Sequence, residues 1–313
     1  MKLSELVEYL NVLQQDHVNP DYQMAMSKFL ALRHLTDNHY LQFSEFSEKL
    51  TTAFNTAEHS ILKVESLVDE LKDKIISTIE NLELAQLAET ERWYSNEECM
   101  VSNSYILQRR MKIDDDSNIF LRARLKCYTD WRLPGMIIRP GLESFIEDLV
   151  PLDPLYLVDQ DRKLLVPTLK KFNLKYRKRL RPYVVDEFQQ ENPLCQLPNG
   201  QFGFIFAWNF FNYKPIAVVN QYLSDFYQKL RPGGVAIFSF NDCDIAQGAR
   251  MAEGNFMSYV PARKIKSYAE KIGFDILYHH RRAGDVVWLE IKKPGEIQSI
   301  RGGQSLAKIV AHQ

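Results

Sequence analysis

The chain has 313 residues, of which 45% are apolar and 12% aromatic, so it can bury a sizeable core, and its length suggests about two domains. The formal net charge of −1 excludes the strongly basic proteins whose overall charge alone draws them to nucleic acid or membranes. The four cysteines are far apart and no apolar run approaches the roughly 20 residues that span a bilayer, so we expect no metal site and no membrane partner.

Glycine and proline divide the chain into two parts. Neither residue occurs from Asp21 to Leu133, and all 13 glycines come after Pro134. Because both residues interrupt helices, the first part is predicted to be mostly helical and the second to turn often. We expect a helical, coiled-coil-containing arm over residues 1–93, a helical connector over 94–134, an α/β domain over 135–295 and a C-terminal tail over 296–313.

A heptad pattern runs through the arm. Its apolar positions alternate by four and three residues, and they are Leu50, Phe54, Ala57, Ile61, Val64, Val68, Leu71 and Ile75. A narrow stripe of this period is typical of a left-handed coiled coil, so we expect self-association through residues 40–90. The alternative is a helical bundle packed within one chain. The pattern falters at Thr78 and is expected to resume, less cleanly, through Ile79, Leu82 and Gln86.

An acidic run in the connector precedes a new helical pattern. Residues 114–116 are all aspartate, and Ile119, Leu121 and Leu125 follow at helical spacing. Aspartate is a favoured N-cap residue, because its carboxylate accepts the free N–H groups of a first helical turn. The run therefore predicts the start of a helix.

Strand and helix patterns alternate after Gly135. Strands are predicted at 136–139, 155–158, 183–185, 202–208, 235–240, 274–278 and 286–291, and helices at 141–150, 163–172, 216–230 and 262–272. This alternation indicates βαβ units and a mainly parallel sheet. The adjacent His279 and His280, near the end of one strand, are expected at the surface.

The stretch 230–244 organises this second part. A Pro-Gly-Gly turn at 232–234 ends one helix, and a short apolar run reads as a strand buried on both faces. Polar Asn241, Asp242 and Asp244 follow at the strand's carboxyl end. Open α/β sheets bind their ligands at this edge, so we expect the functional site there.

Three segments resemble the class I S-adenosylmethionine-dependent methyltransferases. The segment Leu155-Tyr-Leu-Val-Asp159 resembles that family's second strand, residues 196–209 resemble its loop and fourth strand, and residues 230–240 resemble its Leu-x-Pro-Gly-Gly turn and fifth strand. The resemblance covers residues 135–295. It implies a Rossmann-like, seven-stranded, mainly parallel sheet whose last strand is antiparallel, with S-adenosylmethionine as the cofactor.

The resemblance also implies cofactor-binding residues. Asp159 would hold the ribose hydroxyls, Asp186 would reach the adenine, and Asn209 would lie after the fourth strand. Gly141 would serve the tight turn after the first strand. Arg139 stands near the place of the family's acid, where it would meet the methionine carboxylate.

The end of the first strand departs from the family pattern. The family has an acid followed by a Gly-x-Gly loop, whereas this chain has Arg139-Pro140-Gly141. Two functions stay open: a methyltransferase of unknown substrate with an oligomerisation arm, and a catalytically inactive methyltransferase-fold protein with a structural or assembly role. No catalytic residue is assigned, because positioning supplies most of the catalysis in methyl transfer.

The whole chain also resembles methyltransferase-like proteins of marine tailed bacteriophages, which have long helical N-termini. That resemblance implies a place in a larger protein assembly. Widely spaced cysteines are typical of a reducing compartment, so the expected location is the cytoplasm or a virion.

A basic run, Lys170–Arg181, contains seven cations. Contact with nucleic-acid phosphates is one interpretation of such a run. A solvated helix face is the favoured one.

Overall fold

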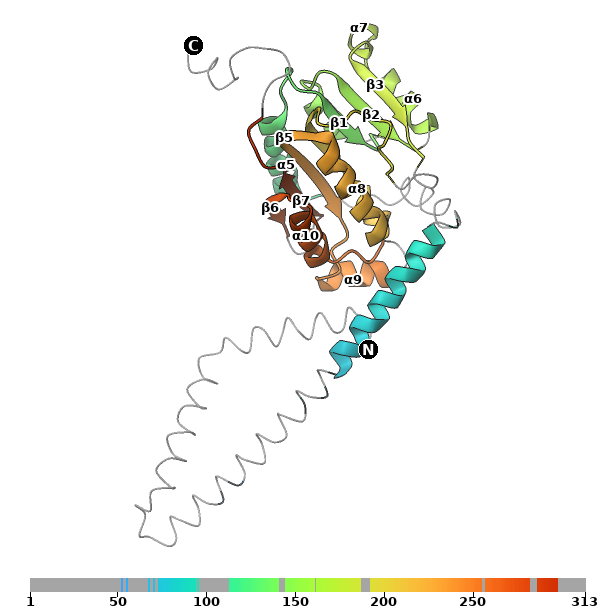
Figure 1. Ribbon diagram of the computed structural model, residues 1–313, viewed down its shortest axis with the longest axis vertical. Coiled ribbons are helices and arrows are strands. Elements are labelled where there is room, and N and C mark those ends of the chain that lie inside the picture. The colour runs from blue at the N-terminus through green and yellow to red at the C-terminus, as the bar shows by residue number, and fades with distance from the viewer. Residues whose placement is uncertain are drawn as a thin grey trace, which may run out of the picture. The chain divides into compact units, whose positions relative to one another are not determined.

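The computed structural model describes residues 73–93, 113–140, 144–160, 162–186, 192–254, 257–281 and 286–297, with Thr52, Asn55, Leu67, Glu70 and Ser95 (Figure 1). The chain divides into two compact units, Met1–Leu84 and Ala85–Gln313.

In the first unit, residues 73–84 are helical. Of the positions where the pattern was expected to resume, Leu82 and Gln86 are buried and Ile79 is 41% exposed, and Thr78, where the pattern was expected to falter, is buried too. Thr78 can be buried because its hydroxyl donates a hydrogen bond to the Lys74 carbonyl, 2.6 Å away. The heptad positions before Ile75 lie outside the described residues, so the coiled coil stays a prediction.

The described part of the second unit contains a seven-stranded sheet in the order β3-β2-β1-β4-β5-β7-β6. The strands are β1 Gly135–Ile138, β2 Leu155–Asp159, β3 Leu180–Val184, β4 Phe202–Ala207, β5 Leu230–Phe240, β6 Asp275–His280 and β7 Val287–Lys292. Strands β1 to β5 pair in parallel, and β7 is antiparallel to both of its neighbours. This confirms the predicted Rossmann-like, mainly parallel sheet.

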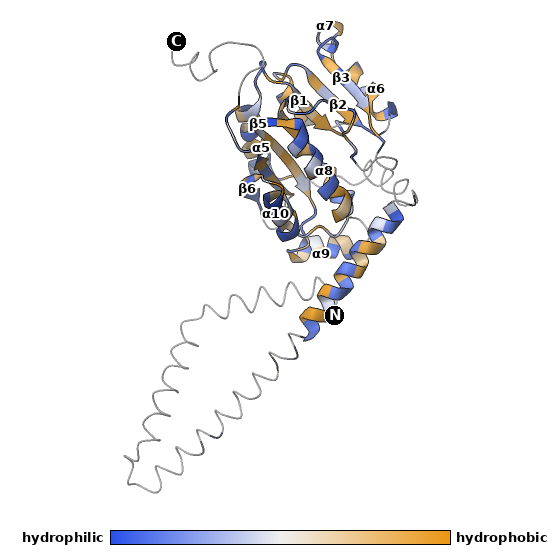
Figure 2. Ribbon diagram, viewed as in Figure 1, coloured by the Kyte–Doolittle hydropathy of each residue, from blue (hydrophilic) through white to orange (hydrophobic). Residues whose placement is uncertain are grey.

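Helices cover both faces of the sheet. They are α5 Asp115–Tyr128, η1 Ser144–Leu149, α6 Arg162–Lys170, α7 Leu174–Arg177, η2 Phe211–Tyr213, α8 Ile216–Lys229, α9 Ala246–Glu253 and α10 Ala262–Lys271. One apolar cluster joins the sheet to α5, η1 and α6, and the other joins it to α8 and α10 (Figures 1 and 2). Among the described residues, no helix combines the length and apolar character needed to cross a membrane.

Asp114 is the N-cap of α5, as the acidic run predicted. Its carboxylate accepts the Ser117 backbone N–H at 2.9 Å and the Ser117 hydroxyl at 2.7 Å. The Ser117 Oγ lies 3.2 Å from Nε2 of His280, which links the start of α5 to β6. The cap is therefore part of the packing between α5 and the sheet.

The predicted surface position is wrong for His280, and His279 is half-buried. His280 is only 8% exposed, and its ring stacks on Trp288 with centroids 3.6 Å apart. Burial, with help from the charges of Lys266 and Arg281, lowers the pKa of His279 to about 4. The His280 ring is covered by α5 and by Trp288 of β7, whereas the His279 ring stacks on Phe240 of β5 with centroids 6.2 Å apart.

A buried ion pair joins α5 to β7. Glu290 is 0% exposed, and its carboxylate accepts hydrogen bonds from the Arg124 guanidinium, the shortest of them 2.6 Å. The hydroxyl of Tyr128 donates to the same carboxylate at 3.1 Å. The Glu290 hydrogen bond raises the pKa of Arg124, while burial is the main cause that raises the pKa of Tyr128 to about 12.

The Pro-Gly-Gly turn lies within β5 rather than before it. Phe202 pairs with Leu230 and Phe204 with Val235, so residues 231–234 bulge out of the strand. Gly233 has a φ of 76°, and a Cβ there would lie 2.4 Å from the Ile297 backbone nitrogen. Only glycine permits both this left-handed backbone and so close an approach.

Candidate functional site

The carboxyl ends of β1 to β5 meet at one edge of the sheet. The chain passes from β1 to β2 and β3 on one side, and then returns to β4 and β5 on the other. Ligands of open α/β sheets bind where the strand order reverses, which is between β1 and β4 here. Of the predicted site residues, Arg139 directly follows β1, Asp159 ends β2, and Asn209 follows β4 after Trp208.

Arg139 turns the chain at the end of β1. Its backbone N–H donates to the Val158 carbonyl at 2.7 Å, and its φ of 52° is left-handed. That conformation costs a residue other than glycine about 1–2 kcal/mol. The side chain is only 6% exposed, and its guanidinium carbon lies 5.5 Å from the centre of the Phe210 ring. Arg139 therefore reaches from β1 toward the end of β4.

The two predicted acids lie at the carboxyl ends of the neighbouring strands β2 and β3. Asp159 ends β2, is 2% exposed, and pairs with Val184 of β3. Its carbonyl accepts the Val185 N–H at 3.0 Å. Asp186 lies just beyond β3 and is half-buried. Gly141 lies outside the described residues.

A buried polar chain fixes the turn after β4. Asn209 has a left-handed φ of 50°, and its backbone N–H donates to the Ser239 hydroxyl at 2.7 Å. The Ser239 hydroxyl in turn donates to the Asn212 side-chain oxygen at 3.1 Å. Sequence reasoning missed Ser239 and Asn212, because nothing local marks a serine inside a buried strand as a partner of this loop.

Lys214 ends the same loop in an aromatic environment. It is 1% exposed, and its ammonium nitrogen lies 3.8 Å from the centre of the Trp93 ring and 4.7 Å from that of Phe210. Such cation–π contacts stabilise a desolvated ammonium by about 2 kcal/mol. Phe210 thus contacts two buried cations, Arg139 and Lys214, at the reversal of strand order.

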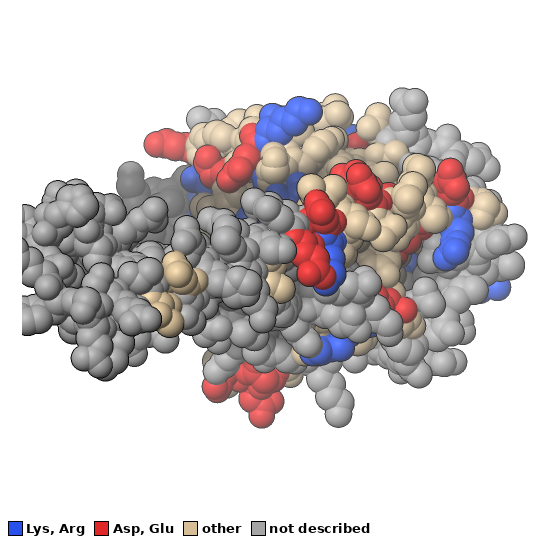
Figure 3. All heavy atoms as spheres, turned by 90° about the horizontal axis from the view of Figure 1, so that it is seen from below, with Lys and Arg blue, Asp and Glu red and all other residues tan. Residues whose placement is uncertain are grey.

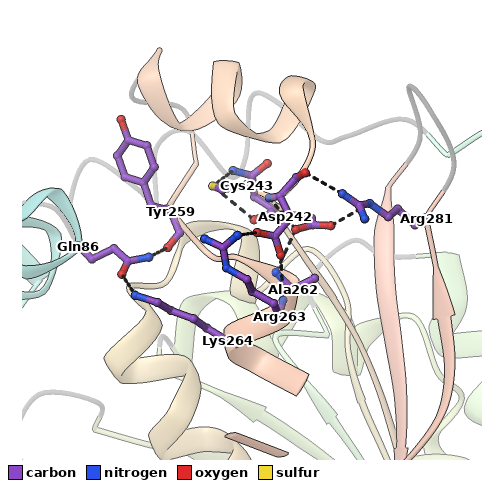
Figure 4. A network of polar contacts seen from close by, with 10 residues as sticks. Gln86, Asp242, Cys243, Tyr259, Ala262, Arg263, Lys264 and Arg281 are labelled. Atoms are coloured by element: carbon purple, nitrogen blue, oxygen red, sulfur yellow. Dashed lines mark hydrogen bonds and ion pairs between the residues drawn. The ribbon is translucent and has the colours of Figure 1, made fainter. Parts of the chain in front are cut away.

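A polar network holds the end of β5 (Figure 4). Asp242 is 1% exposed, and its Oδ1 accepts the backbone N–H groups of Asp244 at 2.9 Å and Ala262 at 3.0 Å. Its Oδ2 lies 3.3 Å from Nε of Arg281. Burial raises the pKa of Asp242 in spite of these contacts. The network ties the end of β5 to the start of α10.

Residues 85–93 are helical, and two of their side chains bind the chain just before and within α10. The Gln86 side chain donates to the Tyr259 carbonyl at 2.8 Å and accepts from Lys264 at 3.0 Å (Figure 4). The Glu89 carboxylate accepts the Tyr259 N–H at 3.2 Å. This helix therefore contacts two loops: Gln86 and Glu89 bind Tyr259 in the loop before α10, and Trp93 contacts Lys214 in the loop after β4.

The likeness to known proteins is found among solved structures. The sequence matches no model of a protein family, and no curated protein matches it. Similar solved structures include an S-adenosylmethionine-dependent methyltransferase from Mesorhizobium loti, with 12% identity and a TM-score of 0.44, covering 55% of this chain and 96% of that one.

Two further similar structures are the N-methyltransferase NodS from Bradyrhizobium japonicum and phosphoethanolamine N-methyltransferase 2 from Haemonchus contortus. NodS has 12% identity and a TM-score of 0.43, covering 58% of this chain and 99% of its own. The Haemonchus enzyme has 15% identity and a TM-score of 0.43, covering 55% of this chain and 52% of its own. Likeness this low carries no argument about the reaction. The strand order and pairing themselves give the chain the class I methyltransferase fold.

Proposed function

We propose that the chain is an S-adenosylmethionine-dependent methyltransferase whose cofactor binds across the carboxyl ends of β2, β1 and β4. The observation that carries the proposal is the buried Asp159 at the end of β2, beside the reversal of strand order between β1 and β4. An acid in this position suits the two hydroxyls of a ribose, because a carboxylate accepts a hydrogen bond on each oxygen.

The other residues have roles that follow from their positions. Arg139 would pair with the carboxylate of the methionine end, and Asp186, beyond β3, would reach the adenine. Asn209 would border the cofactor from β4. When bound, the cofactor supplies a methyl group on a sulfonium, which is a good leaving group. Phe210 and Trp93 would exclude water and orient the acceptor, so the chain needs little acid–base chemistry of its own.

An inactive fold with a structural role is the second candidate, and Arg139 is the observation that favours it. The family places a glycine-rich loop after the first strand, whereas this chain has a buried arginine in a left-handed turn. A guanidinium that filled the space of the methionine end would exclude the cofactor. A place in a phage particle and a larger assembly belong to this second candidate.

Replacing Asp159 tests the proposed ribose contact. We expect Asp159→Ala to weaken the binding of S-adenosylhomocysteine by about 10- to 150-fold, which corresponds to roughly 1.5–3 kcal/mol for hydrogen bonds to a charged group. Calorimetric titration measures this directly. Asp275→Asn, an exposed acid at the start of β6, is the matched control and should leave affinity unchanged. Equal affinity for wild type and Asp159→Ala would remove Asp159 from the site.

We also propose that residues 40–90 associate with a second copy of the chain. The support is the sequence pattern alone: Ile61, Val64 and Val68 would stay exposed on an isolated helix. Val68→Asp should dissociate the oligomer, because burying an unpaired charge is costly. Sedimentation that shows a wild-type monomer at micromolar concentrations would contradict this proposal.

A further inference from the structure

We propose that the sheet edge formed by α6, α7 and β3 binds the phosphate backbone of nucleic acid. Residues 162–185 contain nine lysines and arginines and no acid, in a chain whose net charge is −1. We call these nine side chains the basic edge. Such a local concentration of one charge attracts polyanions even when the whole chain is near neutral.

The basic edge is not the solvated face of one helix that the sequence suggested. Its cations are spread over α6, the four-residue α7, the outermost strand β3 and the turns between them, which hold Lys171, Lys178 and Arg179. They therefore face solvent from three elements. A surface of this width can contact several phosphates along one strand, which a single helix turn cannot do.

Three arginines give the basic edge a fixed shape. Arg177 donates to the Phe172 carbonyl at 2.8 Å, and Arg181 donates to the Lys178 carbonyl at 2.7 Å. Arg179 lies 3.3 Å from the Asp153 carboxylate and 5.1 Å from the Tyr176 ring centre. The remaining exposed cations include Arg162, Lys170, Lys171, Lys175 and Lys178. In the described part of the chain, these five form no ion pair.

The part of the basic edge formed by α7 and the start of β3 lies away from the candidate site, whereas Arg162 and Lys163 begin α6 soon after Asp159. Tyr176 donates to the Val150 carbonyl at 3.0 Å, and Arg179 contacts Asp153, both just before β2 begins. These contacts place α7 at the amino ends of the strands, opposite the edge that carries Asp159 and Asn209 (Figure 1). Seen from the other end, the described residues show acidic and basic side chains intermixed (Figure 3). Phosphate binding by the cations of α7 and the start of β3 therefore does not depend on the proposed methyl transfer.

Nucleic acid fits this surface better than a lipid bilayer. Interfacial binding to lipid needs a helix with a continuous apolar face that can enter the headgroup region. Here α7 has only four residues and α6 contains Pro167. Phosphates, in contrast, need exposed cations at intervals along a groove or edge, which is what the basic edge offers.

Binding of the full-length protein to a labelled, short single-stranded DNA oligonucleotide tests the proposal. Fluorescence anisotropy in KCl from about 50 to 200 mM should give a log–log slope of affinity against salt near −3.5, if about five phosphates are contacted. Lys171→Glu/Lys175→Glu should bind about tenfold more weakly, with a slope near −2. The control Lys126→Glu/Lys271→Glu makes the same charge change at exposed sites elsewhere and should stay within about threefold of wild type.

Three results would overturn the proposal. One is the absence of oligonucleotide binding by wild type at the lowest salt. Another is an equal loss of oligonucleotide affinity in both double variants, which would mean that net charge alone determines binding. The third is cosedimentation with phosphatidylserine vesicles, lost in Lys171→Glu/Lys175→Glu, without oligonucleotide binding. That outcome would assign the basic edge to a membrane surface.

Discussion

Arg124→Met should lower the free energy of unfolding by about 3–5 kcal/mol, the cost of leaving a buried charge without its partner. Glu290 is 0% exposed, and the guanidinium of Arg124 is the cation that neutralises it. Methionine keeps most of the side-chain length but supplies no donor. The Tyr128 hydroxyl alone, at 3.1 Å, cannot replace a bidentate guanidinium. Equilibrium unfolding in urea measures the loss.

A double variant separates the charge from the packing. Arg124→Met/Glu290→Leu removes both partners, and buried pairs replaced by apolar residues often recover their stability. We expect the double variant to be more stable than Arg124→Met. If the two are equally unstable, the loss comes from packing between α5 and β7 rather than from an uncompensated carboxylate.

Trp93→Ala should destabilise the second unit by about 3–5 kcal/mol, the usual range for truncating a buried tryptophan. Trp93 is 1% exposed, belongs to the apolar cluster of α8 and α10, and contacts the Lys214 ammonium at 3.8 Å. Its loss opens a cavity and leaves that ammonium with fewer aromatic contacts. Hydrogen exchange should rise in the loop after β4, residues 208–215, which Lys214 anchors.

Trp131→Ala is the matched control, since Trp131 is 47% exposed. Its free energy of unfolding should change by less than about 1 kcal/mol. A similar loss of unfolding free energy in the two variants would mean that the helix over residues 85–93 does not hold the loop after β4.

The sequence predicted the sheet because buried parallel strands are continuous apolar runs. Residues 202–207 and 235–240 consist almost wholly of strand-forming apolar residues and match β4 and most of β5. Strand β3 was predicted too short, because Arg181 and Pro182 are poor strand residues that only an edge position tolerates. Its length is set by pairing with β2, which no local pattern encodes.

Helix α9 could not be predicted from its own sequence. It contains Gly248, which lowers helix propensity, and its buried side chains are only those of Ala249 and Ala252. A Cβ at Gly248 would lie 1.9 Å from the Asp242 carbonyl oxygen, so close packing against the end of β5 requires the glycine. The helix exists because of this tertiary contact.

The candidate site was predicted only where strand ends mark it. Asp159 ends an apolar strand and Asn209 lies just beyond another, so the fold rule placed them at the carboxyl edge. Gln86 and Glu89 were missed because their partner Tyr259 is more than 160 residues away in sequence. The role of Trp93 depends in the same way on the distant Lys214.

The most direct test of the proposed function is calorimetric titration of wild type, Arg139→Ala and Arg139→Gly with S-adenosylhomocysteine and 5′-methylthioadenosine, which lacks the amino-acid end. If Arg139 pairs with the methionine carboxylate, wild type binds both ligands. Arg139→Ala then weakens S-adenosylhomocysteine about 10- to 150-fold and leaves 5′-methylthioadenosine unchanged. Wild type that binds neither ligand, with binding gained in Arg139→Gly, would contradict the account and assign the chain to the inactive fold.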